Sequence, residues 1–274
     1  MIAIIYRNGY EQQRMPRKAW TAITVACLAG LLSLPSAAVW AAGLPDGFVY
    51  LREVAPAIAQ DMRYYGSHNF IGRPIDGYQA PECILTREAA AAVKAVHEDL
   101  AAAGLRVKVF DCYRPTRAVA QFVRWSRDLE DQRMKAEFYP NIAKTDFFRL
   151  GYVAKRSGHS RGSTVDLALE PAAASPSQVD ARADGPAVAC TAPFAERFPD
   201  SPLDFGTGFD CMDPLSHPDS PAVPSEAQRN RALLAQAMER HGFRGLPEEW
   251  WHFTLKAEPF PNTWFDFPVM APGQ

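Results

Sequence analysis

Two short segments far apart in the chain share one pattern, a strand-like alternation with a potential metal ligand on its polar side. In STVDLAL, apolar residues alternate with Asp166, which therefore points away from the apolar face. In WWHFTL, Trp251, Phe253 and Leu255 share one face, and His252 lies on the opposite one. If these strands are neighbours in an antiparallel sheet, Asp166 and His252 meet at one point.

Flanking residues complete the ligand set of a catalytic zinc site. His159 precedes the first strand in a glycine-flanked loop, and Glu249 lies three residues before His252. A regular strand would place Glu249 and His252 on opposite faces, so we expect Glu249 in a turn just before the strand. The two histidines and Asp166 supply three ligands and leave the fourth tetrahedral position to water. Glu249 can take the proton of that water, so the pattern indicates a hydrolase.

Each of these residues also has an ordinary structural interpretation. His159 and His252 could be polar residues at strand edges, and Asp166 a solvated carboxylate. Trp250 and Trp251 could be core aromatics and nothing more. The coincidence of all the ligand types in two short segments favours the metal site.

The segment KVFDCYRP adds a cation to the candidate site. Its alternation predicts a short strand that ends at Asp111, and Pro115 is typical of a helix start. Arg114 lies between them, where its side chain can reach a cleft and stabilise the negative charge of a tetrahedral intermediate. The alternative is a structural salt bridge from Arg114 to Asp111.

These motifs together resemble those of a known family. The segments FDCYRP, SGHSRGSTVDLAL, FDCMD, EWWHF and EPFPNTWFDFPV resemble the D-alanyl-D-alanine dipeptidases of the VanX type, zinc peptidases related to D-Ala-D-Ala carboxypeptidases. The resemblance runs from about Gly47 to Val269. It implies one zinc ion held by His159, Asp166 and His252.

The same resemblance implies roles for the other candidates. Glu249 would act as general base and then as acid, and Arg114 would stabilise the intermediate. We assign substrate binding to Asp210, Ser157, Tyr78, Tyr64 and Asp111. The chain departs from the family pattern at Gly158, where a second serine is expected, and in its longer connection from Glu170 to Phe209.

The function implied is zinc-dependent hydrolysis of the dipeptide D-Ala-D-Ala to two D-alanines, in cell-wall dipeptide turnover or salvage. A carboxylate such as Asp210 facing the substrate ammonium would make longer peptides costly to bind. One alternative is a peptidoglycan D,D-carboxypeptidase or endopeptidase that acts on longer stem peptides. Another is a zinc-stabilised binding module, although a purely structural site needs neither Glu249 nor Arg114.

The composition and net charge of the chain limit the kinds of binding partner that we expect. The 274 residues are 47% hydrophobic and 22% charged, with a formal net charge of -2. These values are typical of a globular protein and give no electrostatic reason to expect nucleic acid or an anionic membrane surface as a partner. We expect a small dipeptide substrate, and the oligomeric state stays open.

The N-terminus has the layout of a secretory signal peptide. Arg17 and Lys18 precede an apolar run and then the small-residue stretch PSAAVWAAG, so we expect a signal peptide over residues 1–41, with Met15 as a possible true start. This predicts a periplasmic protein without stable membrane insertion after cleavage. A retained N-terminal membrane anchor is the alternative.

Export changes the interpretation of the cysteines. Cys83, Cys112, Cys190 and Cys211 form an even set, for which three disulfide connectivities exist. We favour Cys83 with Cys112 and Cys190 with Cys211, the pairing that closes two separate local loops. A catalytic role for Cys112 as a nucleophile is a weaker alternative.

Helical patterns frame these strands. We expect a helix over Thr86–Leu105 capped by Thr86, another that begins at Pro115, and a third from Ser225, whose spacing to Gln228 is typical of a capping box. The fold class is therefore α+β: a single domain over residues 42–274, with a small antiparallel sheet carrying the zinc site and helices flanking it. A Pro-, Ala- and Ser-rich insertion covers about 171–202.

Overall fold

The computed structural model describes residues 43–174 and 187–273. The expected signal peptide, residues 1–41, lies outside the described residues, as does part of the expected insertion. Within the described ranges, no helix combines the length and the apolar character needed to cross a bilayer.

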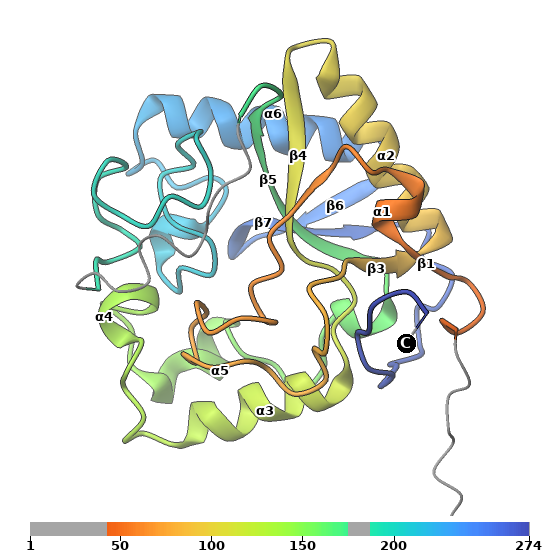
Figure 1. Cartoon of the computed structure of the whole chain (residues 1–274). Helices are drawn as coiled ribbons and strands as arrows, with labels where there is room; N and C mark the ends of the chain where they lie inside the picture. Colours follow the sequence, from red (N-terminus) through yellow and green to blue (C-terminus); the bar gives the residue numbers. More distant parts are fainter. Residues whose placement is uncertain (1–42, 175–186, 274) are drawn as a thin grey trace, which may run out of the picture. The chain divides into compact units, whose positions relative to one another are not determined.

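A five-stranded sheet in the order β2-β4-β5-β7-β6 forms the framework of the fold (Figure 1). Its strands are β2 (Ala59–Gln60), β4 (Leu105–Asp111), β5 (Thr164–Pro171), β6 (Phe243–Leu246) and β7 (Glu249–Leu255). A separate antiparallel pair consists of β1 (Phe48–Tyr50) and β3 (Ile84–Thr86). Strands β4, β5, β7 and β6 pair antiparallel, whereas β2 pairs parallel with β4, so the sheet is mixed at this edge and not purely antiparallel as expected.

Two long helices pack on the sheet. Helices α2 (Arg87–Ala101) and α6 (Ser225–Arg240) contact each other and the strands, and Figure 1 shows them on the same side of the sheet. Helix α3 (Thr116–Arg127) lies apart from them. The short helical segments are α1 (Leu51–Val54), α4 (Lys135–Phe138), α5 (Phe147–Leu150), η1 (Lys144–Asp146), η2 (His159–Arg161) and η4 (Pro214–Ser216).

The helix starts confirm one expected cap and correct another. Thr86 Oγ1 accepts a hydrogen bond from the Ala89 N–H at 3.3 Å, which satisfies a backbone donor at the start of α2. The capping box at Ser225 was wrong, because Pro224 occupies the N-cap position and Ser225 is already helical. The Gln228 amide instead donates to the carbonyl of Val223.

Two hydrophobic clusters lie on either side of the candidate site. The first joins α2 and α6 to the sheet and includes Val96, Leu167 and Trp251. The second is largely aromatic and packs around α3, with Phe122 and Trp125 among its members. Burial of each such side chain stabilises the fold by about 1.5–3 kcal/mol. The two clusters therefore hold the segments that flank the candidate site in place.

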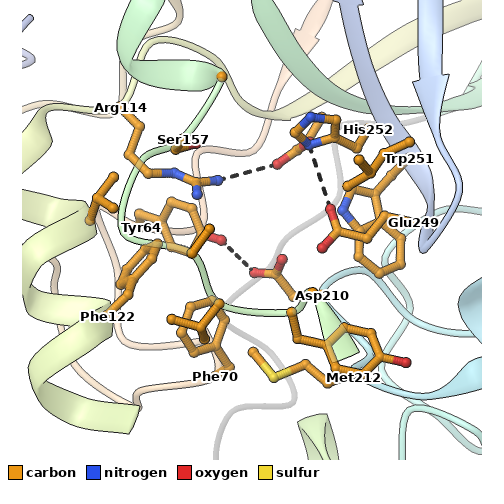
Figure 2. Close-up of a pocket in the computed structure, with 18 of the residues that line it drawn as sticks. Tyr64, Phe70, Arg114, Phe122, Ser157, Asp210, Met212, Glu249, Trp251 and His252 are labelled. Atoms are coloured by element: carbon orange, nitrogen blue, oxygen red, sulfur yellow. Dashed lines mark hydrogen bonds and ion pairs between the residues drawn. The ribbon is translucent and has the colours of Figure 1, made fainter. Parts of the chain in front are cut away.

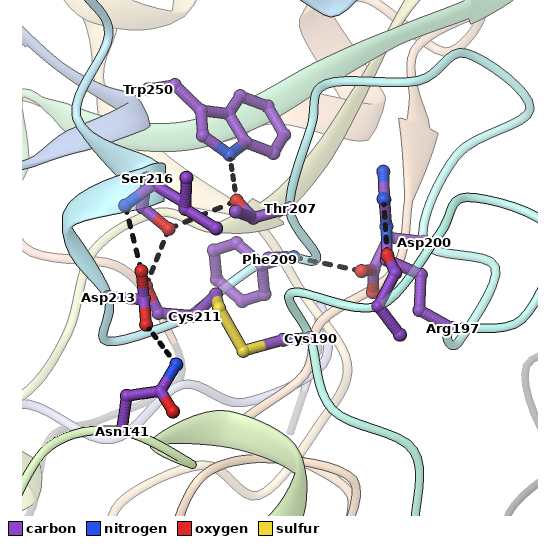
Figure 3. The surroundings of a disulfide bond; sticks show 12 residues. Asn141, Cys190, Arg197, Asp200, Thr207, Phe209, Cys211, Asp213, Ser216 and Trp250 are labelled. Carbon is purple, nitrogen blue, oxygen red and sulfur yellow. Dashed lines mark hydrogen bonds between the residues drawn. A yellow bond between two sulfur atoms is a disulfide. The ribbon is translucent and has the colours of Figure 1, made fainter. Parts of the chain in front are cut away.

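Both expected disulfides are confirmed. Cys83 pairs with Cys112, which joins the segment before β3 to the end of β4. Cys190 pairs with Cys211, which joins the described end of the insertion to the segment before η4 (Figure 3). Because Cys112 is disulfide-bonded, the alternative that it acts as a catalytic nucleophile is wrong.

Candidate active site

The sheet register places three acidic or imidazole side chains in one row. Asp111 of β4 is paired with Asp166 of β5, and Asp166 is paired with His252 of β7. The antiparallel adjacency expected for the two ligand-bearing strands is therefore present. Since residues directly opposite in a ladder project to the same face, the backbone alone brings Asp166 and His252 together.

His159 joins this row from the short helical turn η2. Its Nε2 atom lies 3.2 Å from His252 Nδ1 and 3.2 Å from Asp166 Oδ2, and His252 Nδ1 lies 3.1 Å from Asp166 Oδ1. Two ligands on a tetrahedral zinc ion at 2.0–2.1 Å are separated by about 3.3 Å, so these spacings fit the edges of such a site. The donor types, two imidazoles and one carboxylate, also fit zinc.

The hydrogen bonding and burial of His159 and Asp166 favour binding of a cation between them. His159 Nδ1 donates a hydrogen bond of 2.7 Å to the carbonyl of Cys112, which leaves Nε2 unprotonated and directed at the other ligands. Asp166 Oδ1 is buried, and although His252 Nδ1 lies 3.1 Å away, this oxygen accepts no hydrogen bond of good geometry among the described residues. An unsatisfied buried carboxylate oxygen is costly, and a bound cation would remove that cost.

The charge balance at the ligands favours an ionised aspartate. Burial would raise the pKa of Asp166, but attraction to His159 and His252 outweighs burial and holds this pKa well below its usual range. Burial lowers the pKa of His159, which favours its neutral form. An ionised carboxylate and a neutral imidazole are the forms that ligate metal ions.

Glu249 lies beside this ligand cluster. Its Oε2 atom is 3.5 Å from His252 Nδ1 (Figure 2). It is the first residue of β7 and not part of a turn before the strand. A register shift between Gly245 and Leu246 of β6, opposite this end of β7, breaks the regular alternation of side chains, so Glu249 can lie on the same side as His252. Burial raises the pKa of Glu249 to about 7, and repulsion from Asp166 adds to this shift. A carboxylate with such a pKa is suited to proton transfer near neutral pH.

Arg114 follows β4 and is fixed by several partners. Its Nε and Nη2 atoms each lie 2.8 Å from Asp111 Oδ2, and Nη2 lies 3.5 Å from Asp166 Oδ2. The guanidinium also lies over the Tyr64 ring at 4.9 Å. The salt bridge to Asp111 is therefore present, and Arg114 nevertheless lines the cavity described next.

Tyr78 and Asp111 are placed behind Arg114. The Tyr78 hydroxyl donates to Asp111 Oδ1 at 2.6 Å, and neither residue is among those that line the cavity. The geometry gives these two residues a part in holding Arg114, whereas the sequence assigned them to the substrate. Asp210, Tyr64 and Ser157, the other members of that set, do line the cavity.

A cavity of about 210 Å³ opens onto the ligand cluster. Figure 2 shows Asp210 and Glu249 facing it from one side and Arg114 from another. Asp210 Oδ2 accepts a hydrogen bond of 2.9 Å from the Tyr64 hydroxyl, and its backbone has a φ of 58°, in the left-handed region that few side chains adopt. The disulfide at Cys211 fixes the chain directly after this residue (Figure 3).

Several residues that line the cavity were not predicted from the sequence to belong to the site. Trp251 packs in the apolar cluster on the sheet, as the alternation predicted, and it also lines the cavity. The apolar wall also includes Phe70, Phe122 and Met212, which come from three distant segments. Of these, Phe122 lies on the buried face of α3. Arg156 lines the cavity as well and stands directly before the SGHSR motif.

The glycine at position 158 has a local steric reason. A Cβ atom added there would lie 2.7 Å from Thr164 Oγ1, closer than real Cβ atoms approach. Thr164 cannot retreat freely because its hydroxyl is hydrogen-bonded to the Thr254 hydroxyl at 2.9 Å. The serine expected from the family pattern therefore does not fit beside this threonine.

An α+β fold with three clustered side chains that could hold a metal ion, a carboxylate of raised pKa and a fixed arginine is typical of a metallohydrolase. The family model described as D-ala-D-ala dipeptidase, of peptidase family M15, matches residues 45–178 and 197–270. The chain belongs to this family and is a metallopeptidase.

Curated relatives agree with this assignment. A D-alanyl-D-alanine dipeptidase of Streptomyces coelicolor is 40% identical over 222 residues, which cover 81% of this chain and 98% of the relative. Proteins of the same name from Enterococcus faecium and Escherichia coli are 36% and 30% identical, covering 81% and 78% of this chain and 98% and 87% of the relatives. A solved structure of a mutant vancomycin resistance D,D-pentapeptidase VanY with Zn(II) aligns at 13% identity and a TM-score of 0.35, covering 73% of this chain and 88% of that chain.

Proposed function

We propose that this protein hydrolyses D-Ala-D-Ala to two molecules of D-alanine, with one zinc ion held by His159, Asp166 and His252. The observation that carries the proposal is the convergence of these three donors, at 3.1–3.2 Å from one another, beside Glu249 in a small charged cavity. Family membership and the names of the relatives support the substrate.

A bound zinc ion supplies a Lewis acid for the scissile carbonyl and for the attacking water. Glu249 removes the proton of that water, and its raised pKa then allows it to deliver the proton to the leaving amine. Arg114 donates hydrogen bonds to the oxyanion that develops at the attacked carbonyl. Asp111 and Tyr78 keep the guanidinium in place, so little reorganisation is needed during the reaction.

Asp210 is suited to bind the free ammonium of the substrate. Its carboxylate faces the same cavity as Glu249, and the Tyr64 hydroxyl orients it. Burial raises the pKa of Asp210 well above its usual range, and repulsion from Asp166 adds to this shift. A positive charge placed beside Asp210 would restore its ionised form, so the site gains most from a ligand that carries an ammonium group.

The alternative substrate is a longer stem peptide, as in a D,D-carboxypeptidase or endopeptidase. A cavity of about 210 Å³ with a buried carboxylate at one end favours a dipeptide, because a peptide bond in place of the ammonium would leave Asp210 without its partner. A zinc-stabilised binding module is less well supported, since the arrangement of Glu249 and Arg114 serves no purpose in such a module.

We place the protein in the periplasm, in recovery of D-alanine from wall-derived dipeptide. The signal-like N-terminal segment and the two disulfides support export, because disulfides persist mainly in oxidising compartments.

The test is D-alanine release by the purified domain, stripped of metal and then supplied with zinc. We expect D-Ala-D-Ala to be cleaved only after zinc is added, and L-Ala-L-Ala and a stem pentapeptide to be cleaved poorly or not at all. Preferential cleavage of the pentapeptide would support the alternative enzyme, and bound zinc without cleavage of any peptide would support the binding module.

A further inference from the structure

A dipeptide has two charged ends, and only one of them is accounted for by the proposed site. Asp210 faces the ammonium, but the C-terminal carboxylate must enter a cavity that already contains Asp166, Asp210 and Glu249. Without a cation for it to meet, repulsion from these groups would weaken binding. The cavity-lining residues include two arginines, Arg114 and Arg156.

Arg114 is already committed to other carboxylates. Two of its nitrogen atoms lie 2.8 Å from Asp111 Oδ2, and one of them lies 3.5 Å from Asp166. Its positive charge is therefore largely compensated within the protein. In the proposed mechanism its remaining donors serve the oxyanion.

Arg156 differs from Arg114 in each of these respects. It is exposed at the cavity, and among residues 43–174 and 187–273 it forms no ion pair with a carboxylate. Its guanidinium carbon lies 4.5 Å from the centre of the Trp264 ring, a cation–π contact that does not use its N–H groups as hydrogen-bond donors to a carboxylate. Arg161, the other cation near Trp264, is paired with Glu258.

The neighbouring residue completes a receptor for a carboxylate. Ser157 lines the same cavity, and its hydroxyl oxygen accepts a hydrogen bond of 3.2 Å from the His159 N–H. The hydroxyl proton therefore remains to be donated. A planar guanidinium with an adjacent hydroxyl donor is a favourable receptor for a carboxylate.

We propose that Arg156 binds the C-terminal carboxylate of the substrate and thereby determines specificity for peptides with a free C-terminus. The inference rests on the proposed dipeptidase function and adds a binding contact for the second charged end of the substrate. With Asp210 for the ammonium and Arg156 for the carboxylate, the cavity selects a zwitterion.

The experiment compares two substrates on four proteins. D-Ala-D-Ala and D-alanyl-D-alaninamide differ only in the charge of the C-terminus. They are assayed on the wild type, Arg156→Gln, Arg156→Lys and Lys155→Gln, with D-alanine release as the readout. Lys155 is the matched control, because it is an exposed cation next in the chain that lines a different hollow.

We expect Arg156→Gln to lower kcat/KM for D-Ala-D-Ala by roughly 10- to 100-fold, mainly through KM. The same variant should change kcat/KM for the amide by less than about threefold. Arg156→Lys should recover part of the loss, and Lys155→Gln should leave both substrates unaffected. An equal loss on both substrates, or no loss on either, would overturn the inference.

Binding to the inactive Glu249→Gln protein separates this inference from the proposed function. Calorimetric titration should show that D-Ala-D-Ala binds more tightly than the amide, and that adding Arg156→Gln removes the difference. Failure of the wild type to cleave any dipeptide would defeat the proposed function alone. Equal binding of acid and amide would defeat the role of Arg156.

Discussion

Asp166 and His252 stand directly opposite each other on neighbouring antiparallel strands, with Asp166 Oδ1 and His252 Nδ1 3.1 Å apart. The hydrogen-bonded backbone of β5 and β7 therefore sets two of the three proposed ligand positions, and no loop has to order itself to bring these two together. His159, held by the Cys112 carbonyl, supplies the third. A ligand set carried on a sheet in this way is largely preorganised.

Replacement of Glu249 by glutamine removes the proposed base and keeps the size of the side chain. We expect kcat to fall by roughly 10²- to 10⁴-fold with zinc content unchanged. The matched control is Glu248→Gln, one residue earlier and outside the cavity lining. Activity within a few-fold of the wild type in Glu249→Gln would contradict the assignment of the base.

The pH dependence of the reaction follows from the same carboxylate. The base must be ionised, so activity is present above its pKa and is lost as the pH falls through it. Burial raises the pKa of Glu249 to about 7, and the positive charge of a bound zinc ion would lower it. We therefore expect the acidic limb of kcat/KM at or below about pH 7, measured with saturating zinc. An acidic limb well above that pH would require another group.

Arg114→Lys tests whether position or charge alone matters at the oxyanion. Lysine keeps the positive charge but cannot make the same paired contacts with Asp111 while also reaching the substrate. We expect kcat to fall by roughly 10²- to 10³-fold with little change in stability or zinc content. Arg117→Lys, an exposed arginine paired with Asp266, serves as the control and should retain full activity.

The disulfide between Cys190 and Cys211 should affect substrate binding as well as stability. It restrains the residue next to Asp210, whose left-handed backbone conformation needs support from its surroundings. Replacing both cysteines by serine should lower the free energy of unfolding by about 3 kcal/mol and raise KM more than it lowers kcat. Steady-state kinetics with parallel urea unfolding would check this. An unchanged KM in a destabilised variant would limit the disulfide to a structural role.

Asp61 illustrates stability that depends on pH. Burial would raise its pKa, but Arg63 at 2.9 Å and Lys108 at 3.0 Å outweigh burial and lower it. This contribution to stability is thus present above the unfolded pKa of about 4 and is lost as the pH falls through the folded pKa. Asp61→Asn leaves two buried cations without this partner, so we expect a loss of roughly 3–5 kcal/mol at pH 7.

Urea unfolding at several pH values checks the Asp61 prediction. The difference between the wild type and Asp61→Asn should shrink as the pH falls below about 4. Asp219→Asn, at an exposed position, should show no such difference at any pH. A constant difference across the pH range would mean that the lost stability is not electrostatic.

The parts of the site that follow regular backbone rules could be predicted from the sequence. The alternation around Asp166 and His252 predicted their meeting, and the local loops predicted both disulfides. Strand β2 has only two residues, too few for any periodicity, so its parallel pairing could not be foreseen. Trp251 packs in the apolar cluster on the sheet as the alternation predicted, but its contact with the cavity could not be foreseen because a register shift has no signature in an apolar pattern.

Residues that act across long distances in the chain were harder to assign. Tyr78 and Asp111 were assigned to the substrate, yet the contact between them lies behind Arg114. Pairing a tyrosine with an aspartate across different elements depends on packing that local sequence does not encode. The same holds for Phe70 and Met212 in the cavity wall.

The close approach of position 158 to Thr164 also constrains how this sequence can change over time. A mutation from Gly158 to serine alone would place Cβ 2.7 Å from Thr164 Oγ1, so the threonine side chain would have to move. A prior change of Thr164 to a smaller residue such as alanine would open the space. The residue types that fit at positions 158 and 164 are therefore coupled, and a serine in the loop goes with a smaller residue in the strand.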